Sequence, residues 1–198
     1  MTIDHWRTAP TLPGRHVLLR PTVLADVGGL ARAFDTECTR YFLYGAHSEA
    51  PTEASVAAAL ASGHQVLTQV EVGTGEIVGT TSLYDMSEVD RRVTVGSTWL
   101  AQRVRGSAVN SESKLLLLDH CFGALGAGRV QFNVDNLNER SQRAVGAIGA
   151  TREGELRNHA RRRDGSWRNT IVFSVIGQEW PQLRARLVER INRRVSAR

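Results

Sequence analysis

The sequence predicts a mixed α/β protein whose sheet is mostly antiparallel and is flanked by helices. Residues 66–72 and 77–84 each alternate apolar and polar side chains, and the Gly-Thr-Gly turn between them is typical of a β-hairpin. Farther along, the spacing of apolar residues predicts a helix over 111–125, then a strand over 129–134, then a helix over 138–148. Because 198 residues suffice for one substantial core, we expect a single domain.

The N-terminal part of the chain predicts a strand followed by helices. Residues 16–20 are a short apolar strand, and the spacing of apolar residues predicts a helix over 24–34. A shorter helix is expected over 36–44, with aromatic residues that are more typical of core packing than of a pocket. These aromatic residues are Tyr41, Phe42 and Tyr44.

Capping and turn residues predict where the next elements begin and end. Thr52 caps a helix that runs to about residue 63, with half of a capping box, because Ser55 stands where a Glu would reciprocate. Residues 85–92 are predicted to be a polar loop, and 91–100 the strand that follows it.

The C-terminal half predicts two capped helices, a hairpin and a last helix. Either Asn110 or Ser111 is expected to cap the helix over 111–125, and Asn138 the next one. Strands are expected over 153–159 and 167–175, and a basic helix over 179–195. One apolar face of the first helix would consist of Leu115, Leu118, Phe122 and Leu125.

Composition excludes several classes of protein. The longest apolar run, residues 115–118, is far too short to span a bilayer, and no secretory signal is visible, so we expect a cytoplasmic protein. The net charge of +5 comes largely from C-terminal arginines, which we interpret as a solvated face because no aromatic residues interleave with them for nucleic-acid stacking. Cys38 and Cys121 have no metal-binding spacing and are expected to be buried as small apolar residues.

The most informative segment is a short basic loop between a strand and a helix, Arg103-Val104-Arg105-Gly106-Ser107-Ala108. Small residues let a backbone approach a ligand closely, and the first N–H groups of a helix have no partner within the helix. A helix N-terminus beside arginines favours bound anions. The loop therefore predicts a site for a pyrophosphate.

Four motifs, in order, resemble the GNAT superfamily of acyl-CoA-dependent N-acetyltransferases over about residues 14–190. The resemblance is to the branch that contains the ribosomal-protein N-terminal acetyltransferases and many bacterial relatives. The motifs are Leu19-Arg20-Pro21 with Asp26; Arg103-x-x-Gly106-x-Ala108; Asn136-x-Asn138-x-x-Ser141 with Gly149-Ala150-x-x-Glu153-Gly154; and Leu156-Arg157 with Asp164-Gly165 and Glu179-Trp180.

This resemblance implies a single-domain fold whose central strands splay apart to admit the pantetheine arm of acetyl-CoA. It places Ser141 beside the leaving thiolate, and Asn133 and Asn138 along the cofactor arm. The arm would pair with the strand edge near Trp99 and Leu100, although the Trp99 side chain is more typical of a core residue. The pyrophosphate would lie on the loop and first helical turn, namely Arg103, Arg105, Gly106, Ser107, Ala108, Val109 and Asn110.

The general base is where this sequence departs from the family pattern. Many relatives carry a Glu on the strand before the cofactor loop, at the position that Thr94 occupies here. A threonine hydroxyl cannot accept a proton near neutral pH. We take Asp85 as the first substitute, with Glu88, Asp90 or an ordered water as alternatives. A further alternative is that the substrate amine arrives neutral and needs no base.

Three functions compete at this point. The first is transfer of an acetyl group from acetyl-CoA to a primary amine, either a protein N-terminus or a small molecule. The second is an acyl-CoA-binding module without catalysis, suggested by the missing Glu. The third is a basic protein associated with RNA or the ribosome. A homodimer is expected only because the family includes them, and no membrane partner is expected.

Overall fold

The structure is a computed structural model that describes residues 4–42, 49–162 and 164–196. Its strands are β1 (Leu12–Pro13), β2 (Val17–Pro21), β3 (Gln65–Glu71), β4 (Ile77–Ser87), β5 (Arg92–Leu100), β6 (Arg129–Asp135), β7 (Thr151–Arg161) and β8 (Trp167–Ile176). Its α-helices are α1 (Val27–Ala33), α2 (Glu53–Ala61), α3 (Ala108–Asp119), α4 (Glu139–Gly146) and α5 (Trp180–Ser196). The strands form one sheet in the order β1-β2-β3-β4-β5-β6-β8-β7.

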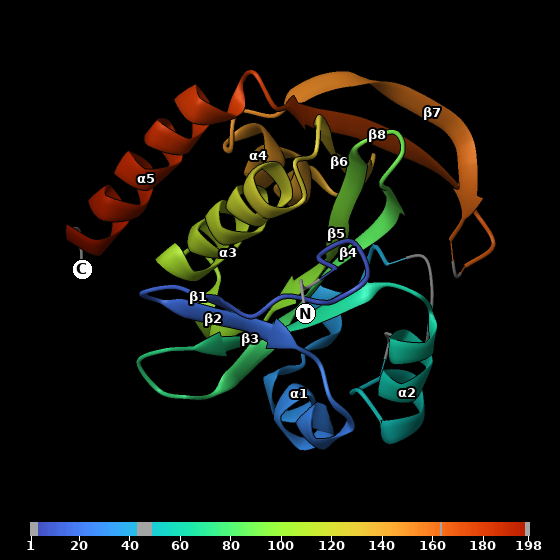
Figure 1. Cartoon of the computed structure of the whole chain (residues 1–198). Coiled ribbons are helices and arrows are strands. Elements are labelled where there is room, and N and C mark those ends of the chain that lie inside the picture. The colour runs from blue at the N-terminus through green and yellow to red at the C-terminus, as the bar shows by residue number, and fades with distance from the viewer. Residues whose placement is uncertain (1–3, 43–48, 163, 197–198) are drawn as a thin grey trace.

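Pairing in the sheet is antiparallel except between β5 and β6, which run parallel. The predicted mixed α/β class is therefore confirmed. Helices α1 and α2 lie on one side of the sheet, against β4 and β3, and α3 lies on the other side with α5 beside it (Figure 1). In the described part of the chain, no helix has the length and apolar character needed to cross a bilayer.

The core lies mainly between the sheet and α3. Leu117, Leu118 and Cys121 are fully buried there, and Val130, Phe132 and Val134 alternate inward from β6. The prediction that Cys121 is a buried thiol is confirmed, whereas the Cys38 side chain lies outside the described residues.

Several predicted boundaries were wrong, each for a local reason. Helix α3 begins one turn earlier than expected, because Gly106 adopts a φ of +78° and the Ser107 side chain caps the helix by accepting from the Val109 N–H. Only residues 88–91 of the expected loop over 85–92 form a turn, because β4 continues through a bulge to Ser87 and β5 begins at Arg92. The capping box at α2 is complete, since the Ser55 hydroxyl accepts from the Thr52 N–H at 2.9 Å.

The helix expected over 36–44 is also wrong as far as the structure describes it. Only a single 3-10 turn forms, over Thr36–Cys38. Phe42 packs against the core as a partly buried side chain, which fits the prediction for it, and Tyr44 lies outside the described residues.

A buried carboxylate ties α3 to the edge of the sheet. Glu112 accepts three backbone N–H groups from the turn between β1 and β2: those of Arg15 at 2.9 Å, His16 at 2.6 Å and Val17 at 2.9 Å. A side chain at Gly14 would clash with this carboxylate, because its Cβ would come within 2.7 Å of Glu112 Oε2. The position of α3 relative to this turn is therefore fixed by the Glu112 side chain.

The two parallel strands stay together for only a short distance. β5 pairs with β6 from Arg92↔Arg129 to Thr94↔Gln131, after which β6 continues to Asp135 along β8. Beyond Thr94, β5 carries a bulge in which Ser97 adopts a φ of +47° and the register with β4 shifts. Bulges increase local twist and bend a strand. β5 and β6 therefore part just beyond Thr94, which is the splay that the resemblance predicted.

Candidate active site

The loop after β5 forms a compact turn whose backbone faces open space. Gly106 is exposed, and no atom lies within 4 Å of where its Cβ would be. Ser107 is buried and caps α3, while Ala108 and Asn110 in the first turn are half-buried. Backbone N–H groups at the start of a helix, with room in front of them, are suited to an anion. The shape and donors of this corner thus fit a pyrophosphate.

The arginine side chains of this loop are bound to carboxylates on neighbouring elements. Arg103 bonds to Glu71 at 2.5 Å and to Glu76 at 2.6 Å, both at the turn between β3 and β4. Arg105 pairs with Asp35, beyond α1, and donates from Nε to the Leu100 carbonyl at 2.9 Å. Their guanidinium groups therefore brace the loop and leave its backbone as the surface that a ligand would meet.

The end of β5 places Trp99 and Leu100 in the core. Trp99 is 6% exposed and meets the Phe34 ring edge-on, with ring centroids 6.1 Å apart. Leu100 is also buried, and the Val109 side chain is buried on α3 beside them. Any contact between these residues and a ligand would have to come from the backbone.

The start of α4 lies at the carboxyl end of β6. The Asn138 side chain caps the helix by accepting from the Ser141 N–H at 3.0 Å, so that capping prediction is confirmed. Ser141 is half-buried in the first turn of the helix. Asn133 is half-buried on β6, where its side chain accepts from Gln131 at 2.9 Å.

A row of polar residues crosses the sheet where β5 and β6 separate. The register pairs Tyr84 on β4 with Thr94 on β5, and Thr94 with Gln131 on β6. Directly opposite residues put their side chains on the same face of a sheet. Thr94 is 3% exposed, so its side chain is buried in this row.

The Tyr84 side chain leans over the strand next to Thr94. A Cβ at Gly96 would come within 2.8 Å of the Tyr84 hydroxyl oxygen. The Tyr84 ring stacks on His64, with centroids 5.0 Å apart and an interplanar angle of 28°. Neither residue could be predicted from the sequence, because only the strand register brings Tyr84 beside Thr94 and His64 level with Tyr84.

Asp85 follows Tyr84 in the bulge at the end of β4. It adopts a φ of +47° and is exposed, and its backbone carbonyl accepts from Arg92 at 3.4 Å. The structure therefore places this predicted base on a strand rather than in a loop, one residue beyond the polar row.

Comparison with known proteins decides the family. A family model described as an acetyltransferase (GNAT) domain matches residues 16–151. The chain belongs to the GNAT acetyltransferase family. No curated protein sequence matches this chain significantly.

Solved structures share the fold of this GNAT acetyltransferase over most of its length. A candidate acetyltransferase is 39% identical, with a TM-score of 0.80 over 89% of this chain and 91% of its own. Another, from T. thermophilus, is 38% identical, with a TM-score of 0.79 over 91% of this chain and 96% of its own. RimJ of Mycobacterium smegmatis in complex with CoA-disulfide is 23% identical and shares the fold, with a TM-score of 0.72 over 87% and 88% of the two chains.

A buried lysine supports the bulge of this acetyltransferase from behind. Lys114 on α3 donates to Thr98 Oγ1 at 2.7 Å and to Thr81 Oγ1 at 3.4 Å, and those two hydroxyl oxygens lie 2.8 Å apart. Complete burial lowers the pKa of Lys114 to about 7. Gln69 on β3 also donates to the Trp99 carbonyl, at 3.3 Å. The bulge that opens the splay is thus held by two neighbouring elements.

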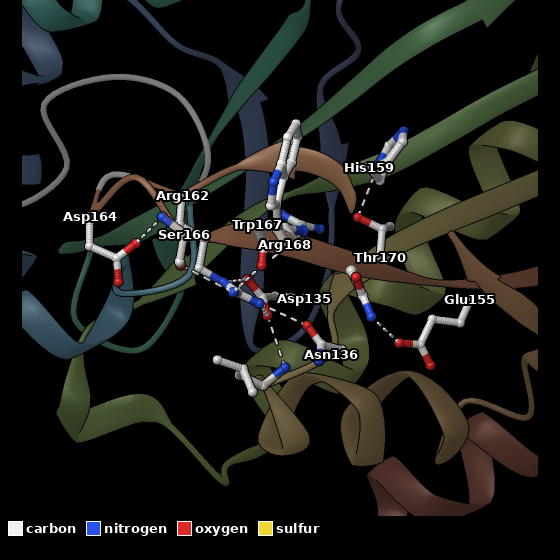
Figure 2. Close-up of polar contacts among 12 residues, drawn as sticks. Asp135, Asn136, Glu155, His159, Arg162, Asp164, Ser166, Trp167, Arg168 and Thr170 are labelled. Carbon is white, nitrogen blue, oxygen red and sulfur yellow. Dashed lines mark hydrogen bonds and ion pairs between the residues drawn. The ribbon is translucent and has the colours of Figure 1, made fainter. Parts of the chain in front are cut away.

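The hairpin of β7 and β8 is fastened to the end of β6 by an ion pair. Arg162 donates to both carboxylate oxygens of Asp135, at 2.9 and 2.8 Å, and to the Asn136 side chain at 2.7 Å (Figure 2). The Asp135 side chain is 1% exposed, and Arg168 lies 3.9 Å from it. This latch fixes the hairpin beside the start of α4, where Ser141 lies.

Another carboxylate near the polar row is locked as an anion. Glu153 on β7 accepts from Arg129 at 2.5 and 2.6 Å and from Ser174 at 2.7 Å. The hydrogen bonds from Arg129 lower the pKa of Glu153 to about 2. A carboxylate with so low a pKa is a weak proton acceptor at neutral pH.

Proposed function

We propose that this protein transfers the acetyl group of acetyl-CoA directly to a primary amine. The observation that carries the proposal is the position of the Ser107-capped turn at the end of β5, immediately beyond the splay between β5 and β6. One feature offers N–H donors to a pyrophosphate, and the other offers a strand edge to an amide-containing arm. The two chemical parts of coenzyme A therefore meet complementary backbone groups in the right order.

The residues of this corner fit the cofactor. The open space in front of Gly106 leaves room for a phosphate against the backbone, and Arg103 and Arg105 hold the loop in place through their carboxylate and carbonyl partners. Beyond the splay, the backbone of Trp99 and Leu100 would line the pantetheine arm. Acetyl-CoA supplies an activated acyl carbon when bound, and the protein residues orient it.

Ser141 and its surroundings would act on the leaving group. We assign to the Ser141 hydroxyl a hydrogen bond to the departing sulfur, which stabilises negative charge as it develops. Asn138 positions Ser141 by capping the helix, and Asn133 would contact the cofactor arm from β6. Asp85 stays a predicted proton acceptor.

The acceptor is a primary amine, either a protein N-terminus or a small molecule. The fold is shared with RimJ and with a ribosomal-protein-S5-alanine acetyltransferase from Vibrio fischeri, the latter at 18% identity. This likeness supports testing peptide N-termini first and assigning the chain to that branch of the family. We also propose a cytoplasmic location and, as a family-level prediction, a homodimer.

The test is release of free thiol from acetyl-CoA over a panel of amines, comprising peptides with free N-termini, aminoglycosides and polyamines. Turnover with any of them supports an enzyme. Stabilisation by acetyl-CoA without turnover would leave only the binding module, and a lack of stabilisation would contradict the proposed cofactor.

A further inference from the structure

The position where GNAT relatives often carry a glutamate is flanked by residues that the fold brings from both sides. Gln65, the first residue of β3, pairs with Leu83, so His64 comes level with Tyr84. Tyr84 in turn pairs with Thr94, and Thr94 with Gln131 in the last pair before the strands separate. A single row thus runs from His64 across β4, β5 and β6 at the level of the splay.

The pair of rings in this row faces the splay. The Tyr84 hydroxyl lies over Gly96, two residues beyond Thr94 and on the same face of β5. His64 stacks on the Tyr84 ring, and both side chains are half-buried. The stack holds the imidazole against the Tyr84 ring, whose hydroxyl leans over Gly96.

Gln131 of this row and the nearby Glu153 both accept hydrogen bonds from Arg129. The Gln131 side chain accepts from Arg129 at 2.8 Å and donates to Asn133 at 2.9 Å. Glu153, behind it, is bound by Arg129 on both oxygens. Of the groups around this row, the imidazole of His64 is the side-chain type that serves most often as a general acid or base.

The charged and titratable neighbours of His64 come from three directions. Tyr84 faces it from β4, where Asp85 is the next residue, and His5 lies in the N-terminal segment whose carbonyl groups accept from Gln65. Helix α2 carries Glu53 in its first turn, at the end away from His64. Asp85 is thus the rival proton acceptor that the experiment must separate from His64.

We propose that His64, held by Tyr84, accepts the proton that the acceptor amine loses during acetyl transfer. This inference rests on the proposed function. The amine nitrogen forms a bond to the acetyl carbon as the carbon–sulfur bond breaks. The proton from nitrogen passes to the imidazole, directly or through one water, and from there to solvent. The departing sulfur takes up a solvent proton beside Ser141, which balances the reaction.

The experiment is a pH profile of kcat/KM with acetyl-CoA and a short peptide that has a free N-terminal alanine. Both the amine and the imidazole must be unprotonated for this step. The wild-type logarithmic profile should therefore rise with a slope of two at acid pH and with a slope of one at higher pH before it levels. His64→Asn should lower kcat/KM at least tenfold at pH 7.5 and leave a slope of one throughout. Added imidazole should restore part of the lost rate.

Control variants separate this role from a structural one. His16→Asn, in the turn between β1 and β2, should behave as wild type. Tyr84→Phe should keep the ring contact with His64 and the steeper, acid part of the pH profile. Stabilisation by acetyl-CoA should be the same in His64→Asn as in wild type.

An unchanged profile in His64→Asn, or loss of the steeper, acid part in Asp85→Asn instead, would overturn the assignment of His64 while leaving acetyl transfer intact. If wild type turns over no amine of the panel, the proposed function itself fails and this assignment fails with it.

Discussion

The cofactor corner can be tested with one substitution and a matched control. Gly106 has a φ of +78° and Gly165, in the turn between β7 and β8, has a φ of +83°, and no atom lies within 4 Å of the Cβ position at either. Replacing either glycine by valine forces an L side chain into the left-handed region, at a cost of roughly 1–2 kcal/mol. The two variants should therefore lose similar stability without ligand.

Acetyl-CoA should distinguish the two variants, because only the Gly106 side chain would point into the space assigned to the pyrophosphate. At a hundredfold its dissociation constant, the ligand stabilises a protein by about 2.7 kcal/mol. Gly165→Val should keep this gain. If Gly106→Val binds at least tenfold more weakly, its gain at the same concentration falls to about 1.4 kcal/mol or less.

The assay is chemical denaturation with and without acetyl-CoA. For each variant it yields the free energy of unfolding and the increase in that free energy caused by the ligand. Equal ligand-dependent gains in Gly106→Val and Gly165→Val would refute the assignment of this corner. A larger loss of stability in Gly106→Val alone, with a normal gain from the ligand, would count against it as well.

Three further changes test other parts of the site. Ser141→Ala should lower kcat more than it weakens acetyl-CoA binding, and a variant with the full rate would remove Ser141 from the mechanism. Lys114 has a pKa of about 7 in the folded protein and an ordinary value of 10.5, so between those values the unfolded chain binds more protons and stability rises with pH. Denaturation at pH 7.0 and 8.5 should show this rise, at most about 1.4 kcal/mol per pH unit, in wild type but not in Lys114→Met. Arg162→Ala leaves the Asp135 carboxylate buried with Arg168 at 3.9 Å and should destabilise by about 3 kcal/mol, while Arg143→Ala, from an exposed pair, should cost less than about 1 kcal/mol.

Local pattern in the sequence was enough to predict most elements of the fold. Alternation predicted β3, β4 and β6, and Asn138 was predicted correctly as a cap because capping is decided within a few residues. The start of α3 was misplaced because Ser107 and Ser111 are equally good caps by residue type, and only the turn at Gly106 selects the first.

The parts of the site that the sequence did not predict depend on strand register. His64, Tyr84 and Thr94 are separated by 10 to 20 residues along the chain, and nothing in their spacing shows that they share one row. The ionic bracing of Arg103 and Arg105 was also missed, because their partners come from the turn after β3 and from the segment after α1. The motif predicted the arginines as ligands of the pyrophosphate, whereas the structure shows what orients them.

Glu112 on α3 accepts hydrogen bonds from three backbone N–H groups at the far edge of the sheet, so these amides report on the position of α3. Those amides exchange with deuterium only when α3 and the β1–β2 turn come apart. A ligand that tightens the first turn of α3 should therefore slow exchange at residues 15–17, although these residues would never touch it. Deuterium uptake of a single N-terminal peptide would then measure occupancy of the cofactor site without any label on the cofactor.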